Sequence, residues 1–284
     1  MAIQTDAYPE LDRVKAFFPL GVAEPSILSV EQIQQFNEKG YIFPLDVFSS
    51  AEMVAHRAYF DDLLEKAFAA GWDSYGINGW HKHCAGMYDL VTEPRILDYV
   101  QDLLGEDLVL WGTHYFVKMP GDSKRVSWHQ DASYWPLTPS KTVTVWLAMD
   151  DADAENGAMQ FIPSSHRNAQ ISYTESRPEE NNVLGQTVLD AEYYGESPVT
   201  VALKAGQMSL HTDWLLHGSE PNMSVRRRCG LTLRFVSSDV RAYNNWNQGS
   251  SVICRGSDPS GHWANYPRPV GELIPQKEDA LQSE

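Results

Sequence analysis

Residues 108–118 read LVLWGTHYFVK and residues 229–236 read CGLTLRFV, and these two stretches decide the fold class. Both are rich in β-branched and aromatic residues, and apolar side chains recur at every second position through much of each, which is the pattern of a β-strand. Four further short stretches share this composition and are separated by Pro, Gly, Asp and Asn: Thr142–Met149, Ala158–Ile162, Thr200–Leu203 and Gln207–Leu210. Short strands joined by long loops predict an antiparallel sandwich or barrel rather than βαβ units.

The first third of the chain has a helical pattern instead. Ser29-x-x-Gln32 and Ser49-x-x-Glu52 are capping boxes, in which each side chain of the pair accepts a hydrogen bond from the backbone N–H of the other residue. A third helix is expected from about Glu93 to Leu104, where a glycine follows. We therefore expect helices up to about residue 105 and strands after it.

The net charge and the number of cysteines limit which partners and which cellular compartment we expect. The chain has 284 residues, and 22 Lys and Arg stand against 38 Asp and Glu, a formal charge of −16. Phosphate backbones and anionic membrane surfaces repel so acidic a chain, so we expect no nucleic-acid partner and no membrane partner. The chain has three scattered cysteines, Cys84, Cys229 and Cys254. Together with an N-terminus that lacks a signal-peptide pattern, they indicate a cytoplasmic protein.

The most informative motif is Ser127-Trp128-His129-Gln130-Asp131. Alternate side chains of a strand point to the same face, so His129 and Asp131 project together. An imidazole and a carboxylate that converge are two of the three ligands of a facial triad, which leaves positions on Fe(II) open for a bidentate oxo-acid and O₂. The pair alone is weak evidence, since a surface histidine beside a turn aspartate has the same spacing.

A third ligand has to come from far along the chain. His211 follows the strand Gln207–Leu210, and His217 lies in a turn after an apolar pair. Either histidine is a candidate, and His211 could equally be a buried core residue. The spacing leaves this choice open.

An acidic co-substrate needs a cation, and the fork of an arginine suits a bidentate grip on a carboxylate. Arg226 and Arg227 precede the strand Cys229–Val236 and are expected to lie in a solvated turn. Period-two counting puts Arg228 and Arg234 on one face of this strand, so an arginine that enters the sheet from the turn is the better candidate for a partly buried anion site.

Four linked blocks resemble the bacterial branch of the phytanoyl-CoA dioxygenase family. In the order of the chain, these blocks are WGTHYFVK (Trp111–Lys118), WHQDASYWPL (Trp128–Leu137), TVWLAMDDADAENGAMQFIPSSHR (Thr144–Arg167) and LLHGSEPNMSVRRRCGLTLRF (Leu215–Phe235). Together they span roughly the middle half of the chain, in the order and spacing of the family. Several linked blocks are far more specific than a single His-x-Asp motif.

The resemblance implies roles that the spacing left open. It makes His217, in the Leu-His-Gly-Ser turn, the third metal ligand beside His129 and Asp131. The arginine that binds 2-oxoglutarate stands eleven positions further on, which is Arg228. Four more residues match co-substrate positions of the family, the last of them loosely: Ser219, His114, Trp146 and Lys82.

The resemblance also implies the architecture. We expect a mainly β double-stranded β-helix, a jelly roll, with N-terminal helices packed against one sheet. The whole chain, 1–284, is expected to form a single domain with a helical part (1–105), a jelly-roll core (106–238) and a C-terminal extension (239–284). The polar stretch 168–198 is expected to form a long loop or a lid.

The activity implied is that of an Fe(II)- and 2-oxoglutarate-dependent dioxygenase. It would use O₂ to hydroxylate an aliphatic C–H of a small-molecule substrate and release succinate and CO₂. Desaturation, epimerisation and cyclisation use the same iron site and stay open, as does an inactive jelly-roll binding protein. Asp131 argues against halogenation, because halogenases of this family have a small residue there. The sequence leaves open the substrate, the oligomeric state, and whether Trp80–His83, Tyr134 and Trp135 line the pocket.

Overall fold

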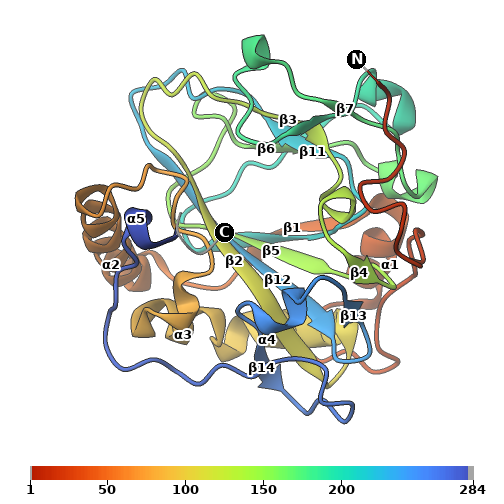
Figure 1. Cartoon of the computed structure of the whole chain (residues 1–284), viewed down its shortest axis with the longest axis horizontal. Coiled ribbons are helices and arrows are strands. Elements are labelled where there is room, and N and C mark those ends of the chain that lie inside the picture. Colours follow the sequence, from red (N-terminus) through yellow and green to blue (C-terminus); the bar gives the residue numbers. More distant parts are fainter. Residues whose placement is uncertain (1, 281–284) are drawn as a thin grey trace.

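Two antiparallel sheets form the centre of the fold (Figure 1). The computed structural model describes residues 2–280. The larger sheet has six strands in the order β1-β10-β5-β12-β2-β14, and the smaller has four in the order β3-β11-β6-β9. The strands of these sheets are β1 (Tyr41–Asp46), β2 (Leu108–Lys118), β3 (Val126–His129), β5 (Val143–Ala148), β6 (Met159–Phe161), β9 (Val199–Thr200), β10 (Gln207–Thr212), β11 (His217–Ser219), β12 (Arg228–Ser237) and β14 (Val252–Arg255). The expected jelly roll is confirmed.

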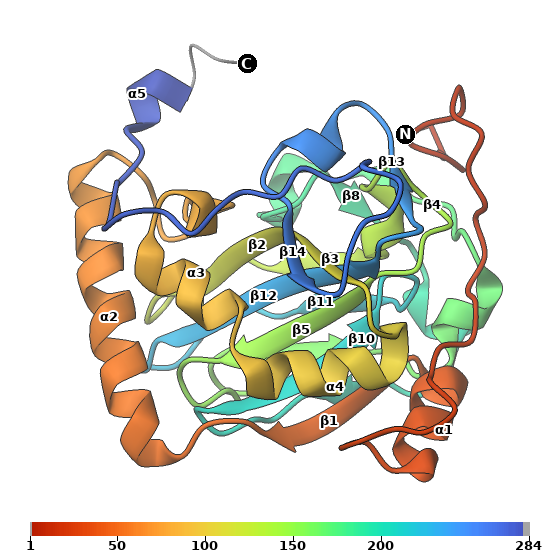
Figure 2. The same cartoon turned by 90° about the horizontal axis from the view of Figure 1, so that it is seen from below.

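Helices cover the outer face of the larger sheet (Figure 2). Both predicted capping boxes are present, at Ser29 and at Ser49, and the third predicted helix is confirmed as α4. The α-helices are α1 (Val30–Lys39), α2 (Ser50–Ala69), α3 (Ala85–Val91), α4 (Pro94–Leu104) and α5 (Lys277–Ala280). Within residues 2–280, none of the helices combines the length and the apolar character that crossing a membrane requires.

Short 3-10 helices and two further strand pairs complete the described chain. The pairs are β4 (Leu137–Thr138) with β13 (Arg241–Ala242) and β7 (Thr174–Glu175) with β8 (Gln186–Thr187). The 3-10 helices are η1 (Trp80–Lys82), η2 (Asp131–Ser133), η3 (Ser165–Asn168), η4 (Pro178–Glu180), η5 (Ala191–Tyr194) and η6 (Trp246–Gln248).

The main hydrophobic core lies between the helices and the larger sheet. Leu231, Leu233 and Phe235 of β12 are fully buried there, against residues such as Phe60 and Leu63 of α2. Since side chains alternate along a strand, Arg228, Thr232 and Arg234 face the opposite side, toward the space between the two sheets. The larger sheet therefore separates a dry core from a cavity that carries polar groups.

The first part of the chain is not purely helical, which corrects the expectation for residues before 105. Tyr41–Asp46 forms the edge strand β1, which pairs with β10. Its sequence, YIFPLD, is short and holds a proline, which an edge strand tolerates but which weakens the local strand pattern. Strand β10 also runs two residues further than expected, so His211 lies within it.

The stretch 168–198 has only short elements, as expected for a long loop. It is nevertheless held against the smaller sheet, because Asn182 Oδ1 accepts a hydrogen bond from the backbone N–H of Ser127 at 2.9 Å. Glu180 Oε2 accepts another from the Ser127 hydroxyl at 3.1 Å. Leu184 of the same stretch lines the central cavity. Movement of this segment as a lid stays a prediction.

Candidate metal centre

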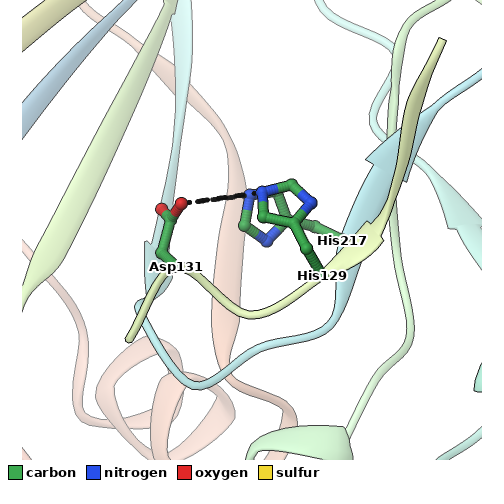
Figure 3. Close-up of side chains that lie close together, drawn as sticks. All are labelled: His129, Asp131 and His217. Atoms are coloured by element: carbon green, nitrogen blue, oxygen red, sulfur yellow. Dashed lines mark ion pairs between the residues drawn. The ribbon is translucent and has the colours of Figure 1, made fainter. Parts of the chain in front are cut away.

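Three buried side chains meet at the end of the smaller sheet. His129 is the last residue of β3, and His217 is the first residue of β11. The two histidines are direct cross-strand partners, which brings residues 88 positions apart side by side. Asp131 opens the 3-10 helix η2 directly after β3, and its carboxylate faces both imidazole rings (Figure 3).

Each of the three side chains directs one potential metal-ligand atom toward a common point. Asp131 Oδ1 lies 3.6 Å from His129 Nε2 and 3.9 Å from His217 Nε2, and the donor atoms of all three residues lie within 4.8 Å of one another. The two ring centroids are 4.1 Å apart. Two imidazole nitrogens and one carboxylate oxygen form the donor set of a facial triad, so these residues fit a single Fe(II) ion.

The histidine tautomers follow from the backbone. His129 Nδ1 is 2.8 Å from the carbonyl oxygen of Ser127, and His217 Nδ1 is 2.9 Å from that of Leu215. A carbonyl oxygen only accepts, so each Nδ1 must carry the proton and donate it. In the neutral form of either ring, the lone pair then lies on Nε2, the atom that faces Asp131. These backbone contacts orient both rings for metal binding.

The charges at the centre also suit a cation. Burial lowers the pKa of His217 to about 4, an effect that the neighbouring His129 reinforces. Burial by itself would raise the pKa of Asp131, but His217, His129 and Arg234 more than offset it, and the pKa of this carboxyl lies below its ordinary value. At neutral pH His217 is therefore neutral and Asp131 is ionised, which are the forms that bind metals.

A cavity of about 540 Å³ opens beside the triad, between the two sheets. That volume lies in the range of roughly 300–1,000 Å³ typical of small-molecule sites. Four of the five predicted co-substrate residues line it: His114, Trp146, Ser219 and Arg228. Tyr134 and Trp135, whose position the sequence left open, line it as well.

Arg228 is 3% exposed, and some of its N–H donors have no partner in the protein. Its Nε donates to the carbonyl oxygen of Gly157 at 3.1 Å, and its Nη1 donates to that of Phe116 at 3.2 Å. Within the described residues it has no carboxylate partner, and its guanidinium lies 5.6 Å from the ring centre of Trp146. A guanidinium carries five N–H donors, so three remain for a ligand.

A buried lysine supports this side of the cavity, and sequence reasoning missed it. Lys118 is the cross-strand partner of Arg228, and it is fully buried. Its Nζ donates to the carbonyl oxygens of Ser219, at 3.2 Å, and of Glu220. Burial and the neighbouring Arg228 lower its pKa to about 6. Lys118 therefore holds the backbone of Ser219 and Glu220 in place.

Lys82 does not reach the cavity, which corrects its expected role at the co-substrate. Trp80, two residues earlier, is buried in the helix-side core, and Lys82 ends the short helix η1 without lining the cavity. Its ammonium donates to the carbonyl oxygen of Gly249 at 2.9 Å and lies 5.8 Å from the ring centre of Tyr266. The cluster Trp80–His83 therefore supports the cavity wall from behind and does not line it.

His211, the other candidate for the third ligand, stands beside the triad without joining it. Its ring centroid lies 4.9 Å from that of His217, and it lines the cavity. Neither ring nitrogen has a hydrogen-bond partner among the described residues. Metal-ligand geometry groups His129 and Asp131 with His217 alone.

The arginines before β12 differ from each other. Arg226 is exposed and pairs with Asp153, as a solvated turn predicts. For Arg227 that expectation is wrong: its side chain is 20% exposed and forms hydrogen bonds with both carboxylate oxygens of the buried Asp150. Arg227 therefore anchors the turn to Asp150. The local sequence does not indicate this contact.

Four cavity residues come from a segment with no chemical signature in the sequence: Asn245, Trp246, Gly249 and Ser250. Asn245 and Trp246, at the start of helix η6, line the cavity from the C-terminal extension. Trp246 packs against Trp111 of β2, with ring centroids 5.7 Å apart. Trp111 was expected only as a strand residue. Nothing in the local pattern connects Trp246 with a strand 135 positions earlier.

A jelly roll with a buried His-x-Asp and a distant histidine at the mouth of a cavity defines the class of mononuclear non-haem iron oxygenases. Comparison with known proteins agrees with this assignment. The family model described as "Phytanoyl-CoA dioxygenase (PhyH)" matches residues 36–230. The chain belongs to the phytanoyl-CoA dioxygenase family.

Individual relatives are distant. A probable alpha-ketoglutarate-dependent hypophosphite dioxygenase of Stutzerimonas stutzeri is 27% identical over 161 residues, 56% of each chain. A probable phytanoyl-CoA dioxygenase of Caenorhabditis elegans is 23% identical over 250 residues, 78% of this chain and 80% of the relative. For the first two curated relatives, this chain spans only just over half of their length, 56% and 57%.

Solved structures share the fold. The apo form of ThoJ, a non-haem monooxygenase, superposes with a TM-score of 0.71 at 25% identity, over 88% of this chain and 91% of the other. EctD from S. alaskensis, with 2-oxoglutarate and 5-hydroxyectoine, gives a TM-score of 0.69 over 96% of both chains. At 18% identity, that likeness concerns the fold alone. Family and donor set together confirm Fe(II) and 2-oxoglutarate as the expected cofactors.

Proposed function

We propose that this protein hydroxylates an aliphatic C–H bond of a small organic molecule, with Fe(II) as cofactor and 2-oxoglutarate and O₂ as co-substrates. One oxygen atom enters the C–H bond of the substrate, and the other enters the succinate formed when 2-oxoglutarate loses CO₂. The observation that carries the proposal is the His129, Asp131 and His217 donor set at a cavity that also holds the buried, carboxylate-free Arg228. When bound, the iron supplies the activation of O₂ that couples both oxidations.

The protein side chains supply binding, orientation and exclusion of water. His129 and His217 hold the metal through Nε2, and Asp131 contributes an ionised carboxylate. Arg228 grips the distal carboxylate of 2-oxoglutarate with the donors that its two backbone contacts leave free. Ser219 offers a hydroxyl beside it.

Trp146 and His114 complete the co-substrate wall. The indole of Trp146 lies under the Arg228 guanidinium, so it limits the positions that the guanidinium can take. His114 Nε2 contacts the carbonyl oxygen of Tyr75 at 2.6 Å, which orients its ring.

Hydroxylation is favoured over halogenation by Asp131. A carboxylate at this position occupies the place that a halide would need, and its negative charge disfavours a second anion at the same metal. The alternative of an inactive jelly-roll binding protein is disfavoured because the three ligands and the arginine are all retained.

A succinate assay over a metabolite library tests the proposal. The Fe(II)-loaded protein should release succinate from 2-oxoglutarate faster with a substrate than without it. Mass spectrometry of the product, with chloride in excess, then separates the reactions: one added oxygen supports hydroxylation, whereas two lost hydrogens indicate desaturation or cyclisation. A halogen isotope pattern would overturn the assignment to hydroxylation. Absence of any Fe(II)-dependent 2-oxoglutarate turnover would overturn the oxygenase function itself.

A further inference from the structure

A second arginine faces the cavity, and the distal carboxylate of the co-substrate does not account for it. Arg234 lies on the same face of β12 as Arg228, and its cross-strand partners are Gly112 of β2 and Thr144 of β5. The Arg234 side chain lies along Gly112, since a Cβ at that position would be in van der Waals contact with Arg234 Nη1 at 3.5 Å. The strand pairing thus provides a place where a long cationic side chain can lie along the cavity floor.

Aromatic rings enclose this guanidinium on two sides. Its central carbon lies 5.7 Å from the ring centre of Trp111 and 5.1 Å from that of Trp135. The two indoles meet edge to face, with centroids 4.7 Å apart at 77°. Cation–π contacts hold the guanidinium in position, but they do not satisfy its N–H groups.

Arg234 has no polar partner. Within residues 2–280 it forms no hydrogen bond and no ion pair, and its Nε is fully buried without an acceptor. Asp131, the acidic group whose charge acts on Arg234, faces the two histidine Nε2 atoms at 3.6 and 3.9 Å and would be a ligand of the metal. A buried guanidinium without an acceptor is costly, so such a group is typical of a site that an anion completes.

The anion is not the distal carboxylate of 2-oxoglutarate. Arg228 and Arg234 are six residues apart on one strand, which places their backbones about 20 Å apart. A five-carbon dicarboxylate is far shorter than this. If Arg228 holds the distal carboxylate, Arg234 faces another part of the cavity, where Trp111, Trp135 and Trp246 form an apolar wall.

We propose that Arg234 binds an anionic group of the primary substrate, and that this substrate is a small organic carboxylate whose carbon skeleton packs against Trp111, Trp135 and Trp246. The inference rests on the proposed function for the identity of the site as the oxygenase centre. Asn245 lies at the same end of the cavity and offers an amide to the same group.

The test measures binding rather than turnover. The Fe(II)-loaded protein with saturating 2-oxoglutarate is titrated without oxygen with 3-phenylpropionate and with its neutral isostere 3-phenylpropionamide, and tryptophan fluorescence is followed. A third probe, 2-phenylethylphosphonate, separates carboxylate from phosphonate binding. The titrations are repeated with Arg234→Gln and Arg234→Lys, and with the exposed Arg226→Gln as the control.

The wild-type protein should bind the carboxylate about 10- to 100-fold more tightly than the amide, as expected for a charge-assisted contact. Arg234→Gln should remove this preference, Arg234→Lys should keep part of it, and Arg226→Gln should behave as the wild type. A stronger preference for the phosphonate would overturn the assignment to carboxylates.

Equal binding of carboxylate and amide by the wild type would overturn the proposal even if Arg234→Gln failed to fold. So would no detectable binding of any anionic probe. The binding result is independent of catalysis. A protein that prefers the carboxylate but never forms succinate would therefore contradict the oxygenase function and leave the anion site in place.

Discussion

Arg228 and Arg234 face the same cavity from one strand, six residues apart, and neither has a carboxylate partner within residues 2–280. Two arginines without an ion-pair partner in one cavity can bind two anionic ligand groups. Backbone carbonyl oxygens orient Arg228, whereas only indole rings position Arg234. The difference suits one constant ligand, the co-substrate, at Arg228 and a second, substrate-derived anion at Arg234.

Replacing Arg228 by Gln should raise the half-saturating 2-oxoglutarate concentration by roughly 10- to 100-fold, because a charge-assisted contact to a carboxylate is lost. Succinate formation at increasing 2-oxoglutarate concentration measures this. The matched control is Arg226→Gln, which removes an exposed arginine two positions earlier and should leave the half-saturating concentration unchanged. An unaltered 2-oxoglutarate requirement in Arg228→Gln would falsify the assignment of this anchor.

Replacing His217 or His129 by Ala should weaken Fe(II) binding by more than about 100-fold, because outer contacts alone contribute roughly 10- to 100-fold at metal sites. Anaerobic equilibrium titration with Fe(II) measures the affinity. His211→Ala, which removes a neighbouring buried imidazole outside the donor set, should leave the affinity nearly intact. Loss of binding in His211→Ala combined with tight binding in His217→Ala would reverse the ligand assignment.

Gly230→Ala should damage the co-substrate site through Trp146. A Cβ at residue 230 would lie 2.0 Å from the Trp146 indole, so the ring that supports Arg228 has to move. Overpacking of this kind costs roughly 1–3 kcal/mol of stability, measured by urea unfolding, and the 2-oxoglutarate requirement should rise as well. Gly185→Ala is the control, since a Cβ there meets no atom within 4 Å. Wild-type stability in Gly230→Ala would show that Trp146 adapts freely.

Asp213 should make stability depend on pH. It is fully buried, and although Ser140 and Thr212 donate hydrogen bonds to it, burial raises its pKa from 3.8 to about 7. Because the folded-state pKa lies above that of the unfolded chain, the bound proton stabilises the fold at low pH. This contribution is lost as the pH rises through about 7, at up to about 1.4 kcal/mol per pH unit.

The variant Asp213→Asn lacks this titration, so its stability relative to the wild type should be greater at pH 8 than at pH 5. Urea unfolding of both proteins at the two pH values measures the difference. A difference between variant and wild type that is the same at both values would mean that Asp213 is ionised throughout.

Local rules were enough for several features of the chain. The capping boxes at Ser29 and Ser49 begin helices because each is completed within four residues. Alternation along residues 229–236 separates the core face of Leu231 and Leu233 from the cavity face of Arg234, since a strand has a period of two. The family resemblance, carried by linked motifs, pointed to His217 and Arg228 before any geometry was available.

Sequence by itself determined the long strands β2 and β12, the capped helices and the His129 and Asp131 pair, because each depends on residues only a few positions apart. Tertiary structure alone decided that His217 stands opposite His129 while His211 remains outside the donor set, that Lys82 supports the wall from behind, and that Trp246 closes the cavity. These relationships depend on which strands pair and in which register, across separations of 88 residues and more. Packing of the whole core sets that register, and no local pattern of side chains encodes it.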